Sequence, residues 1–241
     1  MKLLKFIQRK IFPAKDVILP NEFKNEDDYY TFFFTKHPKW SKPEPNKAEQ
    51  ARLLEIDKLM AIVLQNKTAA TIDIIDFGCG RGWLTNKLSQ YGNATGIEPV
   101  ANVVAYAKKL YPNIKFEIGS IEKLLDKNTD VLIASEVIEH FSDDDKLKYF
   151  AAFNNVLNAN GYCIITTPRA EVQTEWLSFR SDTGQPVENW LTESQVENLA
   201  INSGFEVVQK NILQEHANST NSPLLDLYQI WLFQKKHTNA H

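Results

Sequence analysis

Residues 72–83 have the sequence IDIIDFGCGRGW, in which an apolar run ends at Asp76 and a glycine occupies every second position from 78 to 82. A short apolar run is typical of a buried strand in a parallel sheet, and closely spaced glycines are typical of a tight turn. Glycine is needed where the backbone takes an unusual φ or approaches a ligand closely. The segment therefore predicts a strand, a turn and a helix, with a small molecule lying against the turn. A turn of the same shape without a ligand is the alternative.

The spacing of these glycines argues against two common nucleotide sites. The dinucleotide fingerprint needs a third glycine three residues after the second, and Trp83 occupies that position. The phosphate-binding loop of nucleotide hydrolases closes on Gly-Lys-Ser/Thr, which does not follow Gly82. An NAD-dependent oxidoreductase is therefore a poor match to this sequence.

Composition sets broad limits. With 241 residues, 43% hydrophobic and 24% charged, the chain suits one α/β domain with an extension. The formal net charge of −3 gives no reason to expect a nucleic-acid partner. Cys79 and Cys163 have no metal-binding spacing, which favours a reducing, cytoplasmic location. No apolar run approaches the length of a membrane span.

Residues 1–45 are predicted to form an N-terminal extension. Residues 1–15 carry five basic side chains and no acid, and their apolar residues fall near helical spacing. This pattern predicts a short basic helix that either contacts a membrane surface weakly or packs on the protein itself. Lys5 interrupts the apolar part and no small-residue cleavage site follows, which argues against a signal peptide. The aromatic-rich remainder, up to Pro45, is predicted to be irregular because prolines interrupt it.

Alternating apolar runs and helical segments follow from Asn46 onward. Asn46 is predicted to cap a helix that runs to about residue 65. Ser142 is predicted to cap a helix at 143–158, in which Leu147 faces the core. Thr192 is predicted to begin a helix that ends at Gly204. Strands are predicted at 72–77, 94–98, 115–118, 130–135 and 161–167. Helices between strands indicate parallel pairing. Two last strands, at 205–213 and 227–234, have no helix between them and must pair antiparallel.

The pattern Asp76-x-Gly78-x-Gly80-x-Gly82 resembles the first motif of the class I S-adenosylmethionine-dependent methyltransferases. Five parallel strands closed by an antiparallel pair are also the sheet of that family, so the resemblance covers about residues 50–236. It implies an α/β, Rossmann-like, seven-stranded and mostly parallel sheet with helices on both faces, in a domain at 46–236. It also implies S-adenosylmethionine as the cofactor.

The resemblance assigns cofactor roles to residues at three strand ends. The backbone of Gly78, Cys79 and Gly80 is expected to lie along the methionine and ribose parts of the cofactor. Asp76 is expected to accept a hydrogen bond from the cofactor's ammonium group, unless it caps a helix. Glu98, followed by Pro99, is expected to accept from both ribose hydroxyls. Many relatives have an acid where Ser120 stands, so the adenine is assigned to Ser120 and the backbone at Ile121, with a helix cap at Ser120 as the alternative.

Two arginines, one before the first predicted strand and one after the fifth, are further candidates for binding an anionic group. Some relatives use an arginine on the helix before the first strand to pair with the cofactor carboxylate, and Arg52 is the corresponding residue here, unless it is simply a surface residue. Arg169, after the fifth predicted strand, is a candidate for an anionic acceptor group, with a solvated arginine as the default expectation.

Residues 135–141, SEVIEHF, resemble the EVIEH stretch of the ubiquinone-pathway O-methyltransferases, which faces both cofactor and acceptor. Glu136 is assigned to the cofactor, and Glu139 and His140 to catalysis. Three interpretations are open: His140 is a general base, the three side chains bind a divalent cation, or they only shape the pocket. Related small-RNA ribose methyltransferases have a further downstream histidine, which residues 185–190 lack. Neither a metal nor an RNA substrate is therefore expected.

A hydroxyl acceptor usually has to lose a proton before it attacks, so His140 favours O-methylation of a small-molecule, lipid-linked or glycan acceptor. Aromatic residues of the extension and of 169–190 are expected to roof the acceptor pocket, although most of them suit the core of a cap equally well. N- or C-methylation of a natural product or peptide is an alternative, as is a non-catalytic module that only binds S-adenosylmethionine. The sequence carries no signal for an oligomeric state.

Overall fold

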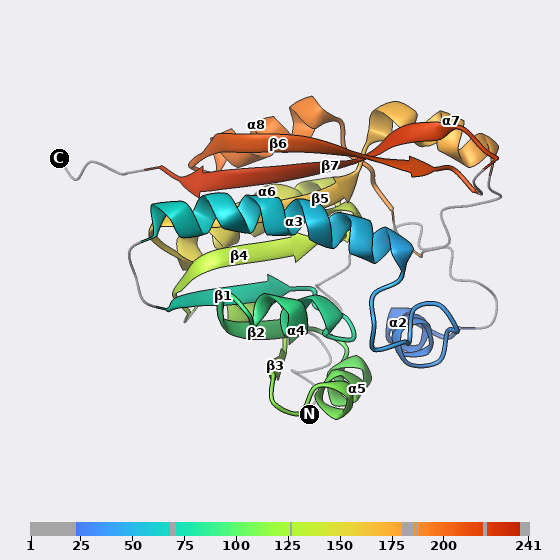
Figure 1. Ribbon diagram of the computed structural model, residues 1–241, viewed down its shortest axis with the longest axis horizontal. Helices are drawn as coiled ribbons and strands as arrows, with labels where there is room; N and C mark the ends of the chain where they lie inside the picture. Colours follow the sequence, from blue (N-terminus) through green and yellow to red (C-terminus); the bar gives the residue numbers. More distant parts are fainter. Residues whose placement is uncertain are drawn as a thin grey trace.

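A single seven-stranded sheet organises the computed structural model, which describes residues 23–67, 71–125, 127–179, 186, 188–218 and 221–236. The strand order is β3-β2-β1-β4-β5-β7-β6 (Figure 1). The first five strands pair in parallel, and β7 runs antiparallel between β5 and β6. The strands are β1 Ile72–Phe77, β2 Gly92–Glu98, β3 Lys115–Ile118, β4 Thr129–Ser135, β5 Leu157–Pro168, β6 Phe205–His216 and β7 Leu224–Lys235. The predicted sheet is confirmed. The predicted basic helix at 1–15 lies outside the described residues.

Helices cover both faces of this sheet because successive residues of each strand point to opposite sides. Ile74 of β1 packs with α3 and α4, whereas its neighbour Ile75 packs with α6 and α8. In Figure 1, α3 crosses one face of the sheet and α6 lies behind it. The helices are α2 Glu26–Thr35, α3 Lys47–Asn66, α4 Trp83–Leu88, α5 Ala101–Leu110, α6 Asp143–Val156, α7 Gln173–Ser178 and α8 Glu193–Asn202.

Two of the predicted helix starts are confirmed as full capping boxes. Asn46 accepts from the N–H groups of the first turn of α3, and the Glu49 side chain accepts from the Asn46 N–H at 2.8 Å. Thr192 and Gln195 exchange the same pair of bonds at the start of α8. Each box satisfies two backbone donors that the helix itself leaves unpaired.

Three local predictions need correction. Helix α2 forms within the stretch that was expected to be irregular, because Asn25 caps it, three acids fill its first turn, and Pro38 and Pro43 lie beyond its end. Ser142 occupies the N-cap position of α6, but its hydroxyl donates to the Asp145 carboxylate at 2.7 Å instead of accepting from the backbone. Leu147 is exposed, because Lys146 and Phe150 take the inner face of that helix.

Among the described residues, no helix combines the length and the apolar character needed to cross a bilayer.

Candidate functional site

The glycine turn lies at the carboxyl edge of the sheet, between the ends of β1 and β2. The N–H groups of Gly78 and Cys79 both donate to the Ile97 carbonyl, at 2.8 and 3.1 Å. Gly78 has a φ of +73°, and a Cβ placed on it would lie 2.5 Å from the Cγ2 of Val137. Glycine is therefore required at this position both by the backbone conformation and by the close approach of the segment that follows β4.

Glu98 ends β2 with its carboxylate turned toward this glycine turn. Its Oε2 accepts from the Gly80 N–H at 3.1 Å and its Oε1 from the Val100 N–H at 3.0 Å. Burial raises the pKa of Glu98 to about 7, although the two backbone hydrogen bonds oppose the shift. A carboxylate oxygen can accept more than one hydrogen bond, so this fixed side chain retains the capacity to take a ligand's hydroxyl groups.

Asp76, at the end of β1, is a second buried acid beside the turn. Its Oδ2 accepts from the Thr85 hydroxyl of α4 at 2.6 Å. Burial raises the pKa of Asp76 to about 7, and the Thr85 hydrogen bond moves it the other way. The charge of Asp76 also contributes to the raised pKa of Glu98. The turn thus brings two carboxyl groups together in a setting where added positive charge is favoured.

A third polar group at the turn, Arg81, was not predicted from the sequence. Its guanidinium is fully buried and donates to both carboxylate oxygens of Glu49, at 2.7 and 2.8 Å. Its Nε donates to the Lys42 carbonyl at 2.5 Å. These bonds tie the first turn of α3 and the segment before it to the glycine turn. In the sequence, Arg81 is marked only by its position between two glycines, and no local pattern predicts that it pairs with Glu49, 32 residues earlier.

Glu136 follows β4 in a left-handed conformation, with a φ of +57° that is uncommon for any residue except glycine. Its Oε1 accepts from the Thr166 hydroxyl at 2.9 Å. Burial raises the pKa of Glu136, and the positive charge of Arg52 partly offsets the shift. A strained conformation at the carboxyl edge of the sheet is typical of a functional position.

Arg52, on α3, is buried, so the alternative that it is a surface residue is wrong. Its guanidinium carbon lies 5.0 Å from the centre of the Tyr228 ring. Burial lowers the pKa of Arg52, but the charges of Glu136 and Tyr228 raise it by more, so the net pKa is raised. Its Nε is buried without a hydrogen-bond partner among the described residues. A buried donor of this kind has unused hydrogen-bonding capacity, which is compatible with the predicted role of Arg52 toward a carboxylate.

Glu139 and His140 lie in the short 3-10 helix Ile138–His140. The Oε2 of Glu139 accepts from the Thr167 hydroxyl at 3.1 Å, and its Oε1 lies 4.0 Å from the Nε2 of His140. Burial, together with the negative charge of Glu136, raises the pKa of Glu139 well above its usual value. Within the part of the chain that the structure describes, no three His, Cys, Asp or Glu side chains are grouped closely enough to hold a metal ion.

Ser120 and Ile121, the residues assigned to adenine, follow β3. The Ser120 hydroxyl lies 3.2 Å from the Tyr149 hydroxyl, and the Ser120 N–H donates to the Glu122 carboxylate at 2.8 Å. Ser120 occupies the N-cap position of the short helix Ile121–Lys123, but its side chain makes no capping hydrogen bond there. Ile121 is partly buried against the core, and Pro99, after Glu98, is half-buried. The assignment of the adenine ring to Ser120 and the backbone at Ile121 stays a prediction.

Other predicted acceptor residues lie apart from this cluster. Arg169 is held by Glu193 at 2.6 Å and by the more distant Glu171 and Asp226, so it is neither solvated nor an open anion site. Trp176 is buried in a small apolar cluster beside the β6–β7 hairpin, which supports the core interpretation for that tryptophan.

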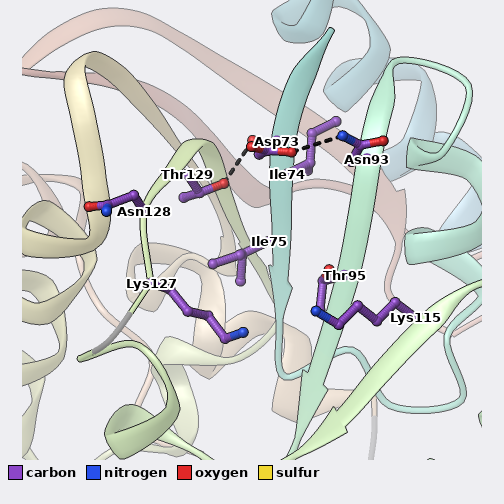
Figure 2. Close-up of a pocket in the computed structure, with 9 residues that line it drawn as sticks. All are labelled: Asp73, Ile74, Ile75, Asn93, Thr95, Lys115, Lys127, Asn128 and Thr129. Carbon is purple, nitrogen blue, oxygen red and sulfur yellow. Dashed lines mark hydrogen bonds between the residues drawn. The ribbon is translucent and has the colours of Figure 1, made fainter.

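A separate polar pocket of about 280 Å³ lies at the opposite edge of the sheet (Figure 2). It is lined by the amino-terminal ends of β1 to β4, including Asp73, Asn93, Lys115 and Thr129. Ligands of open α/β sheets bind at the carboxyl ends of the strands, where the glycine turn lies. This pocket is therefore not the candidate site.

The geometry agrees with comparisons to known proteins. A family model described as a methyltransferase domain matches residues 46–210. The ubiquinone biosynthesis O-methyltransferase of Rattus norvegicus is 32% identical over 112 residues, which are 42% of this chain and 32% of that protein. The corresponding enzyme of Azorhizobium caulinodans is 30% identical over 108 residues, 42% of each chain. The chain thus spans less than half the length of these curated relatives.

Among solved structures, the magnesium protoporphyrin IX methyltransferase of Synechocystis PCC 6803, with bound S-adenosylmethionine, aligns with a TM-score of 0.62. The alignment covers 90% of this chain and 100% of that one, at 13% identity. At this identity the likeness shows the fold alone.

Proposed function

The chain belongs to the family of the methyltransferase domain, and from that premise we propose that it transfers a methyl group from S-adenosylmethionine to a hydroxyl oxygen of a small-molecule, lipid-linked or glycan acceptor. Ubiquinone biosynthesis O-methyltransferases among its relatives support the hydroxyl acceptor. The observation that carries the proposal is the placement of the Glu139–His140 pair at the same sheet edge as the glycine turn and Glu98.

The residues at this edge fit the charges of S-adenosylmethionine, which supplies a methyl group already activated on a positively charged sulfur. Glu98 accepts from the two ribose hydroxyls. Asp76 and Glu136 provide negative charge for the ammonium and the sulfonium. Arg52 donates to the carboxylate, which gives its buried Nε a hydrogen bond that no described residue supplies. Asp76, Glu136 and Arg52 thus match a ligand with two positive charges and one negative charge, while Glu98 binds its neutral ribose.

His140 acts as the general base in this proposal. Methyl transfer from a sulfonium is an in-line displacement, so the protein mainly supplies alignment and a dry site. A neutral imidazole accepts the acceptor's proton as the new oxygen–carbon bond forms. A positive imidazolium 4.0 Å from the Glu139 carboxyl group favours the ionised form that burial disfavours, so Glu139, held by Thr167, stabilises the imidazolium that results. Catalysis by a positioned base typically accelerates a reaction by about 10²- to 10⁴-fold.

The test is a transfer assay with S-adenosylmethionine labelled on the methyl group. A panel of quinols, catechols, glycans and primary amines is offered to the wild-type protein and to His140→Gln. We expect label on a hydroxyl compound, and a loss of about 100-fold or more in the variant with unchanged affinity for S-adenosylmethionine. Label on amines alone, or an unimpaired variant, contradicts O-methylation by this base.

A further inference from the structure

Arg52 and Arg81 are both buried, but their guanidinium groups are held in different ways. Arg81 donates to both carboxylate oxygens of Glu49 and to the Lys42 carbonyl, so its donors are used within the protein. The guanidinium carbon of Arg52 lies instead over the ring of Tyr228, 5.0 Å from the ring centre. A ring face attracts a cation but offers no oxygen acceptor. Tyr228 can therefore hold this guanidinium in place while its N–H donors remain available to a ligand.

Tyr228 lies at the carboxyl edge of the sheet, where the candidate site is. It is near the start of β7, which runs antiparallel to β5 and so begins at the edge where β5 ends (Figure 1). Its backbone pairs with Pro168 at the end of β5 on one side and with Leu213 of β6 on the other. Its side chain packs against the buried cluster of Trp176, Ala217, Leu225 and Leu227. The ring is therefore fixed by two neighbouring strands and by an apolar support.

The charges around Tyr228 keep its ring neutral. Burial raises the pKa of Tyr228, and the charges of Glu136 and Glu215 raise it further, while the charge of Arg52 lowers it. The phenol therefore stays protonated at neutral pH and does not cancel the positive charge of Arg52. A carboxylate in its place would do so, as Glu49 does for Arg81.

Tyr228 also lies outside the part of the chain that the methyltransferase family model matches. That match ends at residue 210, whereas Arg52 and Glu136 lie within it. The contact between Arg52 and Tyr228 thus joins a matched residue of the candidate site to a strand that the family match does not cover.

We propose that Tyr228 is a positioning residue for Arg52, and that its ring holds the guanidinium at the carboxyl edge of the sheet so that the free Nε–H donates to the carboxylate of S-adenosylmethionine. Tyr228 acts through Arg52 in this arrangement. Binding of ligands that carry the carboxylate therefore depends on Tyr228, and binding of ligands that lack it does not. The inference rests on the cofactor part of the proposed function and is independent of the acceptor.

The test compares Tyr228→Leu and Tyr228→Phe in the full chain. Calorimetry measures the affinity for S-adenosylmethionine and for its decarboxylated form, which keeps the ammonium and the sulfonium and lacks only the carboxylate. We expect Tyr228→Leu to weaken binding of S-adenosylmethionine by about three- to tenfold and to leave binding of the decarboxylated form unchanged. Tyr228→Phe retains the ring and should bind both ligands as the wild type does. An equal loss for both ligands, no loss at all, or the same loss in both variants overturns the proposal.

Tyr91→Leu is the matched control. Tyr91 is also half-buried and contacts the same helix, with its hydroxyl donating to Asp57 of α3 at 2.8 Å, but it lies before β2 at the opposite edge of the sheet. Both affinities should be unchanged in this variant. A selective loss of S-adenosylmethionine binding in Tyr91→Leu would show that any disturbance of α3 has this effect, and it would overturn the assignment to Tyr228.

A double variant tests whether Tyr228 acts through Arg52. In an Arg52→Met background, Tyr228→Leu should cause no further loss of affinity, because the group that it positions is already absent. A further loss as large as in the wild-type background overturns the proposal. A wild-type chain that binds neither ligand contradicts the proposed function instead, so the two failures are distinguishable.

Replacement of Tyr228 by pentafluorophenylalanine tests the contact even if the leucine variant fails to fold. This side chain nearly keeps the shape of phenylalanine but reverses the charge distribution of the ring face, so it no longer attracts a cation. Relative to Tyr228→Phe, it should weaken binding of S-adenosylmethionine and leave binding of the decarboxylated form unchanged. Equal affinities of the two variants for S-adenosylmethionine overturn the proposal.

Discussion

Arg81 lies between Gly80 and Gly82 in the turn, and its buried guanidinium donates to both carboxylate oxygens of Glu49 at the start of α3. Glu49 also closes the capping box of that helix. One carboxylate therefore fixes the first turn of α3 and the backbone that is to carry the cofactor. The shape of the cofactor site depends on this contact between residues far apart in the sequence.

Breaking this pair should destabilise the whole domain. Glu49→Gln leaves a buried guanidinium without its counter-charge, and removal of one partner of a buried ion pair typically costs about 3–5 kcal/mol. Urea unfolding measures the loss. Lys58→Ala, which removes an exposed ion pair on the same helix, is the control and should leave the free energy of unfolding unchanged within error. Similar values for the two variants would show that the Arg81–Glu49 pair does not support the fold.

Glu98→Ala should abolish most of the cofactor affinity. Hydrogen bonds to charged groups contribute about 1.5–3 kcal/mol each, so loss of two ribose contacts weakens binding by about 100-fold or more. Calorimetry with S-adenosylmethionine measures the effect. Asp73→Asn, at the opposite end of β1, serves as the control and should bind normally. Retained affinity in Glu98→Ala would remove Glu98 from the site.

Arg52 can be tested with ligands that differ only in the group it is proposed to bind. Arg52→Met should weaken binding of S-adenosylmethionine by at least about tenfold, because a charged donor to the ligand carboxylate is lost. Methylthioadenosine, which lacks the amino-acid part, should bind the variant and the wild type equally. An equal loss for both ligands would show that Arg52 supports the fold and not the carboxylate.

Cofactor affinity should rise with pH through neutrality. The pKa values of Asp76 and Glu98 are both raised to about 7 by burial, so both are partly protonated in the ligand-free protein at neutral pH. A positively charged ligand favours their ionised forms, and binding therefore releases protons. Between pH 6 and pH 8, each acid that must ionise improves the affinity about tenfold.

The same shifts have the opposite effect on the ligand-free fold. A raised folded-state pKa means that the folded protein holds more protons than the unfolded chain between about pH 4 and pH 7. The contribution of these two acids to stability is present at low pH and is lost as the pH rises through 7.

Calorimetric titrations at pH 6 and pH 8 check the predicted rise of cofactor affinity with pH. An affinity that stays flat, or that falls with pH, contradicts the prediction.

The central strands could be predicted because they are mostly buried and therefore appear as short apolar runs. In β1, which ends at Asp76, only Asp73 is exposed. The glycine turn could be predicted because glycine spacing reports directly on backbone conformation. Glu98 followed from its position at a strand end in register with that turn, and Glu136 from the resemblance of residues 135–141 to a known family stretch. Their roles toward a cofactor remain predictions.

The parts that the sequence did not predict depend on contacts between distant segments. Helix α2 was missed because its aromatic residues lack a clear apolar stripe and pack mainly on one another. The place of Phe34 on Gly80, and the pairing of Arg81 with Glu49, join segments whose local patterns are independent. Leu147 was assigned to the wrong face of α6 because Lys146 occupies the inner position and extends its charge to Asp143.

A crystal structure of the protein with S-adenosylhomocysteine tests the central claim most directly. The account predicts the ribose hydroxyls within hydrogen-bond distance of the Glu98 carboxylate and the amino-acid part beside the backbone of residues 78–80. A ligand bound elsewhere on the molecule, or a ribose that does not touch Glu98, would contradict it.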